Sequence, residues 1–419
     1  MKVTKREFLA GTAACFAGNS MFAAALAASS DGDIGSLQSM TAGAVPITVS
    51  ERQSRLRRAT QLMNDAGMRA IVIEAGSALN YFSGIRWWRS ERFTGLVLRA
   101  DGQWCVITPF FEGPSIREQM QFGQDVRTWH EDEDPFALIA DFVNESDVTG
   151  AIGIEETARF FIADGIRRLM PKVALVNAAP VTRGCRMIKS PAELALMQIA
   201  NDVTLAAYEY VYPRVKPGML PSEISAMMNQ ATSALGGTPE FSLVLLGPAS
   251  AYPHGTSQPQ QVRKGEAVLM DCGCHVFGYQ SDISRTWFMG KAGREERRVW
   301  QTVKDGQSLA LDTMRLGTPA GLIDQTVRKF YESRGFGPGY ETPGLTHRLG
   351  HGIGLDGHEP INFVGNETVP LAAGMCFSNE PGIYLPGEFG VRLEDCLYMT
   401  DDGPQLFSPL SPSIDKPFG

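Results

Sequence analysis

The chain has 419 residues and a formal net charge of -8 at pH 7, with 43% hydrophobic and 20% charged residues. This length exceeds one ordinary hydrophobic core and predicts two domains, while the 44 glycines and 25 prolines indicate many turns. The acidic charge argues against nucleic acid as a partner, and no interior stretch is long and apolar enough to cross a bilayer.

The first residues have the composition of an export signal. Lys2, Lys5 and Arg6 precede an apolar run of alanine, leucine and phenylalanine that extends to residue 28 and ends in small residues. This order of basic, apolar and small segments predicts a cleaved leader over residues 1–28, and Lys5-Arg6 resembles a variant of the twin-arginine signal. We therefore expect an exported, periplasmic protein with a polar tether over residues 29–49.

Residues 50–185 alternate between strand and helix patterns, which predicts a first α/β domain. The expected strands are 70–74, 95–98, 104–108, 151–154 and 172–177, and the expected helices are 51–67, 114–121, 135–144 and 157–170. Trp87 and Trp88 fall in a loop between these elements, and exposed tryptophans often anchor an interface.

A second domain is expected over residues 186–419. Ser190 and Pro191, followed by Glu193, have the pattern of a capping box, so a long helix should begin there. Helices are expected at 190–213, 221–235, 293–315 and 320–334. Glycine-rich strands are expected between and after them, among them 267–271, 278–286, 375–382 and 390–396.

The six cysteines that follow the leader form no framework of closely spaced pairs. Cys272 and Cys274 are expected as buried strand residues. Cys376 and Cys396 lie on strands that are expected to be neighbours, so the sequence allows a disulfide between them without requiring one.

Half of the six histidines fall in the glycine-rich stretch 346–360, at His347, His351 and His358. Imidazole binds borderline divalent metals and moves protons near neutral pH. Glycines allow bound groups to approach the backbone closely. Histidines that cap turns would explain this crowding less well than a functional site.

Acidic residues lie in the strands on either side of this stretch. Asp271 and Asp282 precede it, and Glu380 and Glu394 follow it. Taken singly, each acid also fits a turn or an edge position. Four carboxylates that converge would repel one another, and two divalent cations would cancel their charge, so the set favours a metal site.

In order and spacing these residues resemble the metal ligands of the pita-bread metallopeptidase family, in its Xaa-Pro aminopeptidase, Xaa-Pro dipeptidase and creatinase branch. The resemblance implies an α/β (α+β) fold, in which a creatinase-like domain precedes a catalytic domain with a curved antiparallel sheet flanked by helices. It also implies two divalent metal ions, for which we expect Mn2+, with Zn2+, Co2+ and Fe2+ as alternatives. The implied ligands are Asp271, Asp282, His351, Glu380 and Glu394.

The same resemblance assigns roles to residues around the ligands. Glu380 would act as general base on a metal-bridging hydroxide and pass the proton to the leaving amine. His358 matches a histidine that stabilises the tetrahedral intermediate, and His254 matches one that lines the substrate pocket. The remaining residues expected around the substrate and the ligands are His347, Arg392 and Tyr384.

The implied activity is that of a metallo-aminopeptidase that cleaves the Xaa-Pro bond at the N-terminus of peptides. Dedicated prolidases of the family carry an arginine between the second histidine motif and the first glutamate ligand, whereas residues 360–379 contain no arginine or lysine. This departure argues against a strict dipeptidase. Longer Xaa-Pro peptides, or a small-molecule amide, fit the sequence as substrates at least as well as dipeptides do. The alternative is a creatinase-like amidinohydrolase or a lyase with the same fold and metal site.

Members of the family commonly dimerise. We therefore expect a homodimer or a dimer of dimers, in which Trp87 and Trp88 reach toward the site of the partner subunit. A protein of another class, which binds a partner without catalysis, is disfavoured because every ligand of the set is present.

Overall fold

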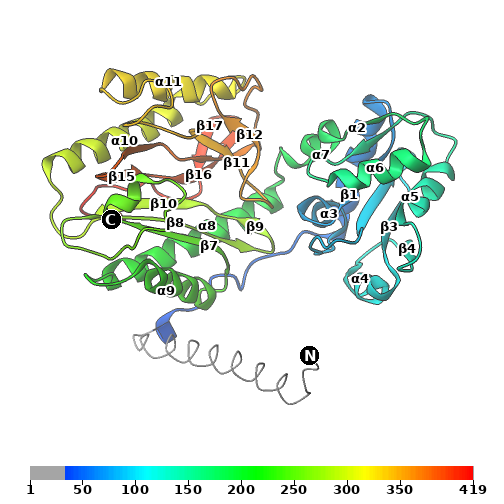
Figure 1. Cartoon of the computed structure of the whole chain (residues 1–419), viewed down its shortest axis with the longest axis horizontal. Coiled ribbons are helices and arrows are strands. Elements are labelled where there is room, and N and C mark those ends of the chain that lie inside the picture. The colour runs from blue at the N-terminus through cyan, green and yellow to red at the C-terminus, as the bar shows by residue number, and fades with distance from the viewer. Residues whose placement is uncertain (1–33, 419) are drawn as a thin grey trace, which may run out of the picture.

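The computed structural model describes residues 34–418, so the expected export signal and the first part of the expected tether lie outside the described residues. The chain forms two lobes that lie side by side (Figure 1). None of the described helices combines the length and the apolar character needed to cross a membrane.

A mixed sheet with the strand order β4-β3-β2-β1-β5-β6 forms the core of the first lobe. The central strand β1 is antiparallel to β2 and parallel to β5, and its apolar run 70–73 is buried on both faces by the flanking helices. The strands are β1 (Met68–Glu74), β2 (Gly95–Arg99), β3 (Trp104–Pro109), β4 (Val126–Trp129), β5 (Ala151–Ile154) and β6 (Leu175–Asn177). The helices of this lobe are α2 (Val49–Asp65), α3 (Ser77–Ser83), η2 (Phe110–Glu112), α4 (Gly113–Gln119), α5 (Pro135–Asn144), α6 (Phe160–Leu169) and α7 (Ala179–Arg186). The short helix η1 (Ile34–Ser36) instead contacts α9 of the second lobe.

The second lobe contains antiparallel sheets between two pairs of helices. Strands pair in the orders β10-β8-β7 and β12-β11-β13-β16-β17, while β9 pairs with β8 and β14 with β15. Helices α8 and α9 pack against β8 and β7, and α10 and α11 lie on the opposite side (Figure 1). The helices are α8 (Pro191–Val211), η3 (Tyr212–Arg214), α9 (Pro221–Ala234), η4 (Gly247–Ala251), α10 (Arg294–Thr313) and α11 (Ala320–Ser333).

The strands of this lobe are β7 (Thr238–Leu246), β8 (Ala267–Val276), β9 (Tyr279–Gln280), β10 (Ile283–Phe288), β11 (Gly350–Gly352), β12 (Glu359–Phe363), β13 (Cys376–Asn379), β14 (Gly382–Leu385), β15 (Phe389–Arg392), β16 (Asp395–Thr400) and β17 (Gly403–Leu406). The predicted strand 267–271 therefore continues to Val276, which places Asp271 inside β8 rather than at its end. The predicted strand 278–286 is divided into β9 and β10 by Ser281 and Asp282.

The capping box predicted at the start of α8 is confirmed. The Ser190 hydroxyl accepts from the backbone N–H of Glu193, and the Glu193 carboxylate accepts from the backbone N–H of Ser190 at 2.8 Å. Ser190 also donates to Glu51 Oε1 of α2 at 2.7 Å. The first turn of α8, the helix that packs against β8, is therefore bonded to α2 of the first lobe.

The prediction of one continuous strand over 390–396 is wrong. β15 ends at Arg392 and pairs with β14, whereas β16 begins at Asp395 and pairs with β13. Between them the backbone N–H of Glu394 donates to the carbonyl of Ser284 at 3.1 Å. The chain therefore crosses from one sheet to another at residues 393–394, and this crossing brings Glu394 beside β10.

The disulfide left open between Cys376 and Cys396 is absent, because all six cysteines among the described residues are free. The two strands are neighbours as predicted, but the register places Cys376 opposite Tyr398 and Cys396 opposite Ser378. Cys272 and Cys274 are buried in β8, as predicted.

The described part of the expected tether packs against the second lobe instead of hanging free. The backbone N–H of Met40 donates to the carbonyl of Leu235 at 2.8 Å, at the end of α9. Ile47 is buried, and Leu37 and Ala44 pack against the same apolar core. These apolar residues form a docking face, which the mainly polar composition of the segment does not predict.

Candidate metal centre

The five residues expected as metal ligands line one cavity of about 320 Å³ in the second lobe. Asp271 lies in β8, Asp282 precedes β10, His351 lies in β11 and Glu380 follows β13. Glu394 comes from the crossing between β15 and β16. The complete lining is His254, Asp271, Asp282, Tyr340, His347, Arg348, His351, His358, Val364, Glu380, Arg392 and Glu394.

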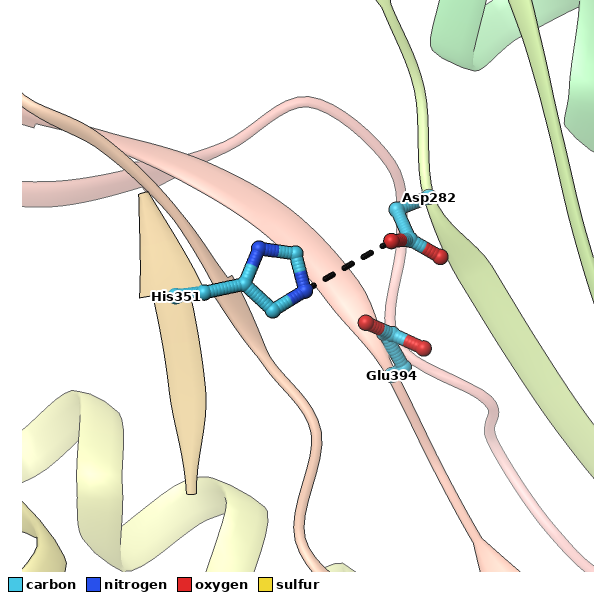
Figure 2. Close-up of side chains that lie close together, drawn as sticks. All are labelled: Asp282, His351 and Glu394. Carbon is cyan, nitrogen blue, oxygen red and sulfur yellow. Dashed lines mark ion pairs between the residues drawn. The ribbon is translucent and has the colours of Figure 1, made fainter. Parts of the chain in front are cut away.

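The buried His351 ring presents one bare nitrogen to the carboxylates. Its Nδ1 lies 3.0 Å from the carbonyl of Gly352, which only accepts, so Nδ1 carries the proton and Nε2 carries a lone pair. Burial lowers the pKa of His351 to about 3 and keeps the ring neutral. Nε2 lies 3.6 Å from Asp282 Oδ2 and 3.4 Å from Glu380 Oε1, and Figure 2 shows it aimed at Asp282 and Glu394.

The carboxylates around this nitrogen repel one another. Burial, reinforced by the neighbouring acids, raises the pKa of Asp282 and of Glu394 well above the ordinary range. Burial likewise raises the pKa of Glu380 to about 7. One ligand atom from each of Asp282, His351 and Glu394 lies within 4.8 Å of the others (Figure 2).

Several oxygens at the centre have no hydrogen-bond partner. Asp271 Oδ1, Asp282 Oδ1 and Glu394 Oε1 are all buried and unpaired. Unpaired buried acceptors are costly, and divalent cations between them would satisfy both the oxygens and the bare imidazole nitrogen. The donor set of oxygens with one nitrogen therefore fits borderline divalent metals such as Mn2+, Fe2+, Co2+ or Zn2+.

Arg392 forms hydrogen bonds that orient the carboxylates of the metal centre. Its buried guanidinium donates to Asp271 Oδ2 at 2.7 Å, to the Ser284 hydroxyl at 2.8 Å and to the Tyr384 hydroxyl at 3.1 Å. Ser284 in turn donates to Glu394 Oε2 at 2.7 Å. Two of the carboxylates are thus oriented by one arginine, directly and through a serine.

A second chain of hydrogen bonds leads from Arg392 to His347. His347 Nδ1 lies 2.7 Å from the carbonyl of Arg348 and carries the proton, so Nε2 accepts from the Tyr384 hydroxyl at 2.8 Å. Burial and the charge of Arg392 lower the pKa of His347 to about 3. His347 is therefore a neutral residue beside Glu380, its Nδ1 being 3.8 Å from Glu380 Oε2.

The other two histidines lie on the cavity wall. The ring of His358 stands edge-to-face on that of His351, with 4.3 Å between the centroids. Partial burial and the charge of Arg348 lower the pKa of His358, so it is neutral at pH 7. His254 lies in the exposed loop after η4 and faces the same cavity.

We predict that Arg392→Met weakens metal binding by about 10- to 100-fold, because the residues that orient metal ligands contribute by that amount. Asp271 would lose its partner, and Ser284 would lose the donor that fixes its hydroxyl. Competition with a chelator measures the affinity, and Arg298→Met on the exposed face of α10 is the matched control. Wild-type affinity in Arg392→Met would contradict this role.

The residues of the site that were not predicted from the sequence are Ser284, Tyr340, Arg348 and Val364. Ser284 stands two positions after Asp282, and the strand alternation that places it toward Glu394 was available as a signal. Arg348 lies between His347 and His351. Nothing in a sequence pattern shows that its side chain turns into the cavity.

The fold and the cavity together define a metal-dependent enzyme. Residues 195–401 match the metallopeptidase family M24, and residues 55–188 match the creatinase/prolidase N-terminal domain. The chain belongs to metallopeptidase family M24. The expected α/β (α+β) architecture, with a creatinase-like domain before a pita-bread catalytic domain, is confirmed.

The similar proteins include named dipeptidases. The probable dipeptidase PepE of Mycobacterium tuberculosis is 32% identical over 83% of this chain and 92% of its own length. The Xaa-Pro dipeptidase of Lactobacillus helveticus is 29% identical over 84% of this chain and 96% of its own. The crystal structure of dipeptidase PepE from Mycobacterium ulcerans superimposes with a TM-score of 0.80 at 30% identity, and covers 87% of this chain and 97% of its own.

Proposed function

We propose that this metallopeptidase cleaves the bond between an N-terminal residue and a following proline in short peptides. The observation that carries the proposal is the single cavity that all five expected ligands line. Its similarity to an Xaa-Pro dipeptidase and to PepE dipeptidases supports the same substrate class. The creatinase-like or lyase alternative has no comparable support among these relatives.

The proposed centre holds two divalent ions, with Mn2+ as the preferred metal. The proposed ligands are Asp271, Asp282, His351, Glu380 and Glu394. When bound, such ions polarise a carbonyl and lower the pKa of water, which makes it a nucleophile at neutral pH.

The residues of the chain supply the proton transfers. Glu380 takes a proton from the attacking water and delivers it to the leaving proline nitrogen. His358, neutral at pH 7, donates an N–H to the oxygen that becomes negative when the carbonyl is attacked. His254, which lines the cavity and is exposed, is proposed to contact the substrate.

A substrate panel tests the proposal. The enzyme loaded with Mn2+ is assayed on a dipeptide, a tripeptide and a longer peptide with proline second, and on matched peptides with alanine second. Release of the first residue from the proline peptides, well above that from the alanine peptides, is expected. Hydrolysis of alanine and proline peptides at equal rates, or of neither, would contradict the proposed specificity.

We also propose a homodimer, or a dimer of dimers, in which Trp88 contacts the partner subunit near its active site. The supporting observation is its exposure: Trp88 is 76% exposed, and the Trp87 ring stacks on it with 5.7 Å between the ring centroids. A large exposed aromatic residue is typical of interface anchors. Full activity in a Trp88→Ala variant that remains dimeric would count against the contact with the site.

The composition of residues 1–28 supports a proposal of export to the periplasm through a leader similar to twin-arginine signals. Fractionation of a Gram-negative host, with N-terminal sequencing of the secreted form, tests it. An uncleaved chain found only in the cytoplasm would overturn it.

A further inference from the structure

A buried ion cluster joins the two lobes beside the turn that carries His358. Glu359, the first residue of β12, is buried. Its carboxylate accepts from Arg186, the last residue of α7, and from the Lys189 ammonium at 2.9 Å. Arg186 also pairs with Asp356 at 2.7 Å. The first lobe and the connection between the lobes are therefore bonded to the second lobe one position after a histidine of the proposed site.

The same carboxylate closes the turn between β11 and β12. Glu359 Oε1 accepts from the backbone N–H of Leu355 at 2.9 Å and from that of Asp356 at 3.3 Å. This turn spans residues 353–358, so His358 is its last residue. One side chain thus connects the backbone of the turn to the basic groups at the junction of the lobes.

The turn packs tightly on this cluster. A β-carbon at Gly354 would come 2.8 Å from Glu359 Oε1 and 2.9 Å from Lys189 Cε, which is closer than van der Waals contact allows. Glycine at this position therefore lets the backbone lie directly against the ion pair. Because packed interiors have low compressibility, a displacement of the pair also displaces the turn and His358 with it.

The cluster stays ionised across the neutral pH range. Burial alone would raise the pKa of Glu359, but Arg186 and Lys189 outweigh burial and lower this pKa to about 2. Burial alone would lower the pKa of Lys189, but Glu359 outweighs burial and raises it. Buried ion pairs often stabilise a fold no better than well-packed apolar side chains of similar size, so a cluster of this kind fits a role in orientation.

We propose that Glu359 is a positioning residue, which together with Arg186 and Lys189 sets the place of His358 in the metal cavity. The inference rests on the proposed peptidase function, in which His358 donates to the oxygen of the attacked carbonyl. Such a donor acts only at hydrogen-bond distance from that oxygen, and a misplacement of about 1 Å costs up to about 100-fold in rate. The first lobe thereby contributes to catalysis in its own subunit, through the last residue of α7.

The test is Glu359→Gln, which keeps the shape of the side chain and removes its charge, in the enzyme loaded with Mn2+. We expect kcat on an Xaa-Pro peptide to fall by about 10- to 100-fold, while KM and the metal content stay those of the wild type, because the disturbed contact forms only in the transition state. Arg186→Met, which leaves Glu359 its bond to Lys189, should lower kcat by a smaller factor. Arg183→Met is the matched control, since this arginine of α7 pairs with Glu156 of its own lobe, and kcat should be unchanged.

A double variant measures whether the effect passes through His358. In a His358→Ala background, Glu359→Gln should lower kcat no further, because two changes that remove the same contact do not add. In the metal-free protein, the NMR signals of the His358 ring should shift in Glu359→Gln and not in Arg183→Met. Arg186→Met carries both comparisons if Glu359→Gln does not fold.

Equal loss of kcat in the presence and absence of His358 would show a purely structural role and overturn the inference, while the peptidase function would stand. Wild-type kcat in Glu359→Gln and in Arg186→Met would overturn it as well. A His358→Ala variant as active as the wild type would overturn both the inference and the proposed role of His358. A wild type that cleaves no Xaa-Pro peptide would overturn the inference together with the proposed function.

Discussion

Glu380→Gln is expected to lower kcat by about a thousand-fold while the metal content stays that of the wild type. The change replaces the group proposed to move the proton with an amide of the same size, which has no comparable basicity near neutral pH. The amide oxygen keeps one donor for the metals, and the other four proposed ligands are unchanged. Loss of catalysis without loss of metal separates the role of base from the role of ligand.

Steady-state kinetics on an Xaa-Pro dipeptide and elemental analysis of the purified protein measure the two quantities. Glu388→Gln, an equivalent change at the exposed β14–β15 turn, is the control and should leave both unaltered. Activity of Glu380→Gln near that of the wild type would remove Glu380 from the proton transfer. Loss of metal in the same variant would instead show that its main contribution is ligation.

The second large effect is expected on the stability of the metal-free protein. Between pH 6.5 and 8 its Tm should fall by several degrees as the pH rises. The folded state holds Asp282 and Glu394 with pKa values raised well above those of the unfolded chain. Such groups favour folding while they are protonated, and each loses about 1.4 kcal/mol per pH unit until its folded pKa is reached.

The choice of this pH window follows from the histidines. The pKa values of His347 and His351 are lowered to about 3 in the folded state, so these rings favour folding above about pH 6.5 and oppose it as the pH falls. Below pH 6.5 the carboxyl groups and the imidazoles therefore act in opposite directions. Above pH 6.5 most imidazoles are neutral in the unfolded state as well, so the carboxyl groups dominate the slope.

Divalent metal should abolish this slope or reverse its sign, because binding requires deprotonated ligands and competes with protons. The measurement is Tm at several pH values with a chelator and with excess Mn2+. The protein loaded with Mn2+ is the control, because titratable groups outside the metal centre contribute to the pH dependence of Tm in both forms. A metal-free protein whose Tm is flat, or rises, between pH 6.5 and 8 would contradict the clustering of buried carboxylates.

The sequence predicts that these five residues meet in one cavity because together they resemble a known ligand pattern, although each acid taken singly also fits a turn or an edge. His351 lies among glycines where few other roles suit an imidazole, and Asp271 interrupts an apolar strand. The capping box at Ser190 and the strand β5 follow from short-range rules of backbone hydrogen bonding and apolar patterning. These features depend on neighbours within a few residues.

The sequence does not predict contacts between residues that lie far apart in the chain. The crossing at Leu393 and Glu394 depends on which sheet each half of the segment joins, and alternation along one strand carries no such information. The docking of Met40 on Leu235 joins residues that no local pattern relates.

We expect five side chains from separate segments of the second lobe to hold a pair of divalent ions. Crystals grown with Mn2+ and measured at an X-ray energy where manganese scatters anomalously test this most directly. We expect two anomalous peaks in the cavity, coordinated by Asp271, Asp282, His351, Glu380 and Glu394. Peaks elsewhere on the molecule, with the carboxylates of the cavity bound only to protons and water, would contradict it.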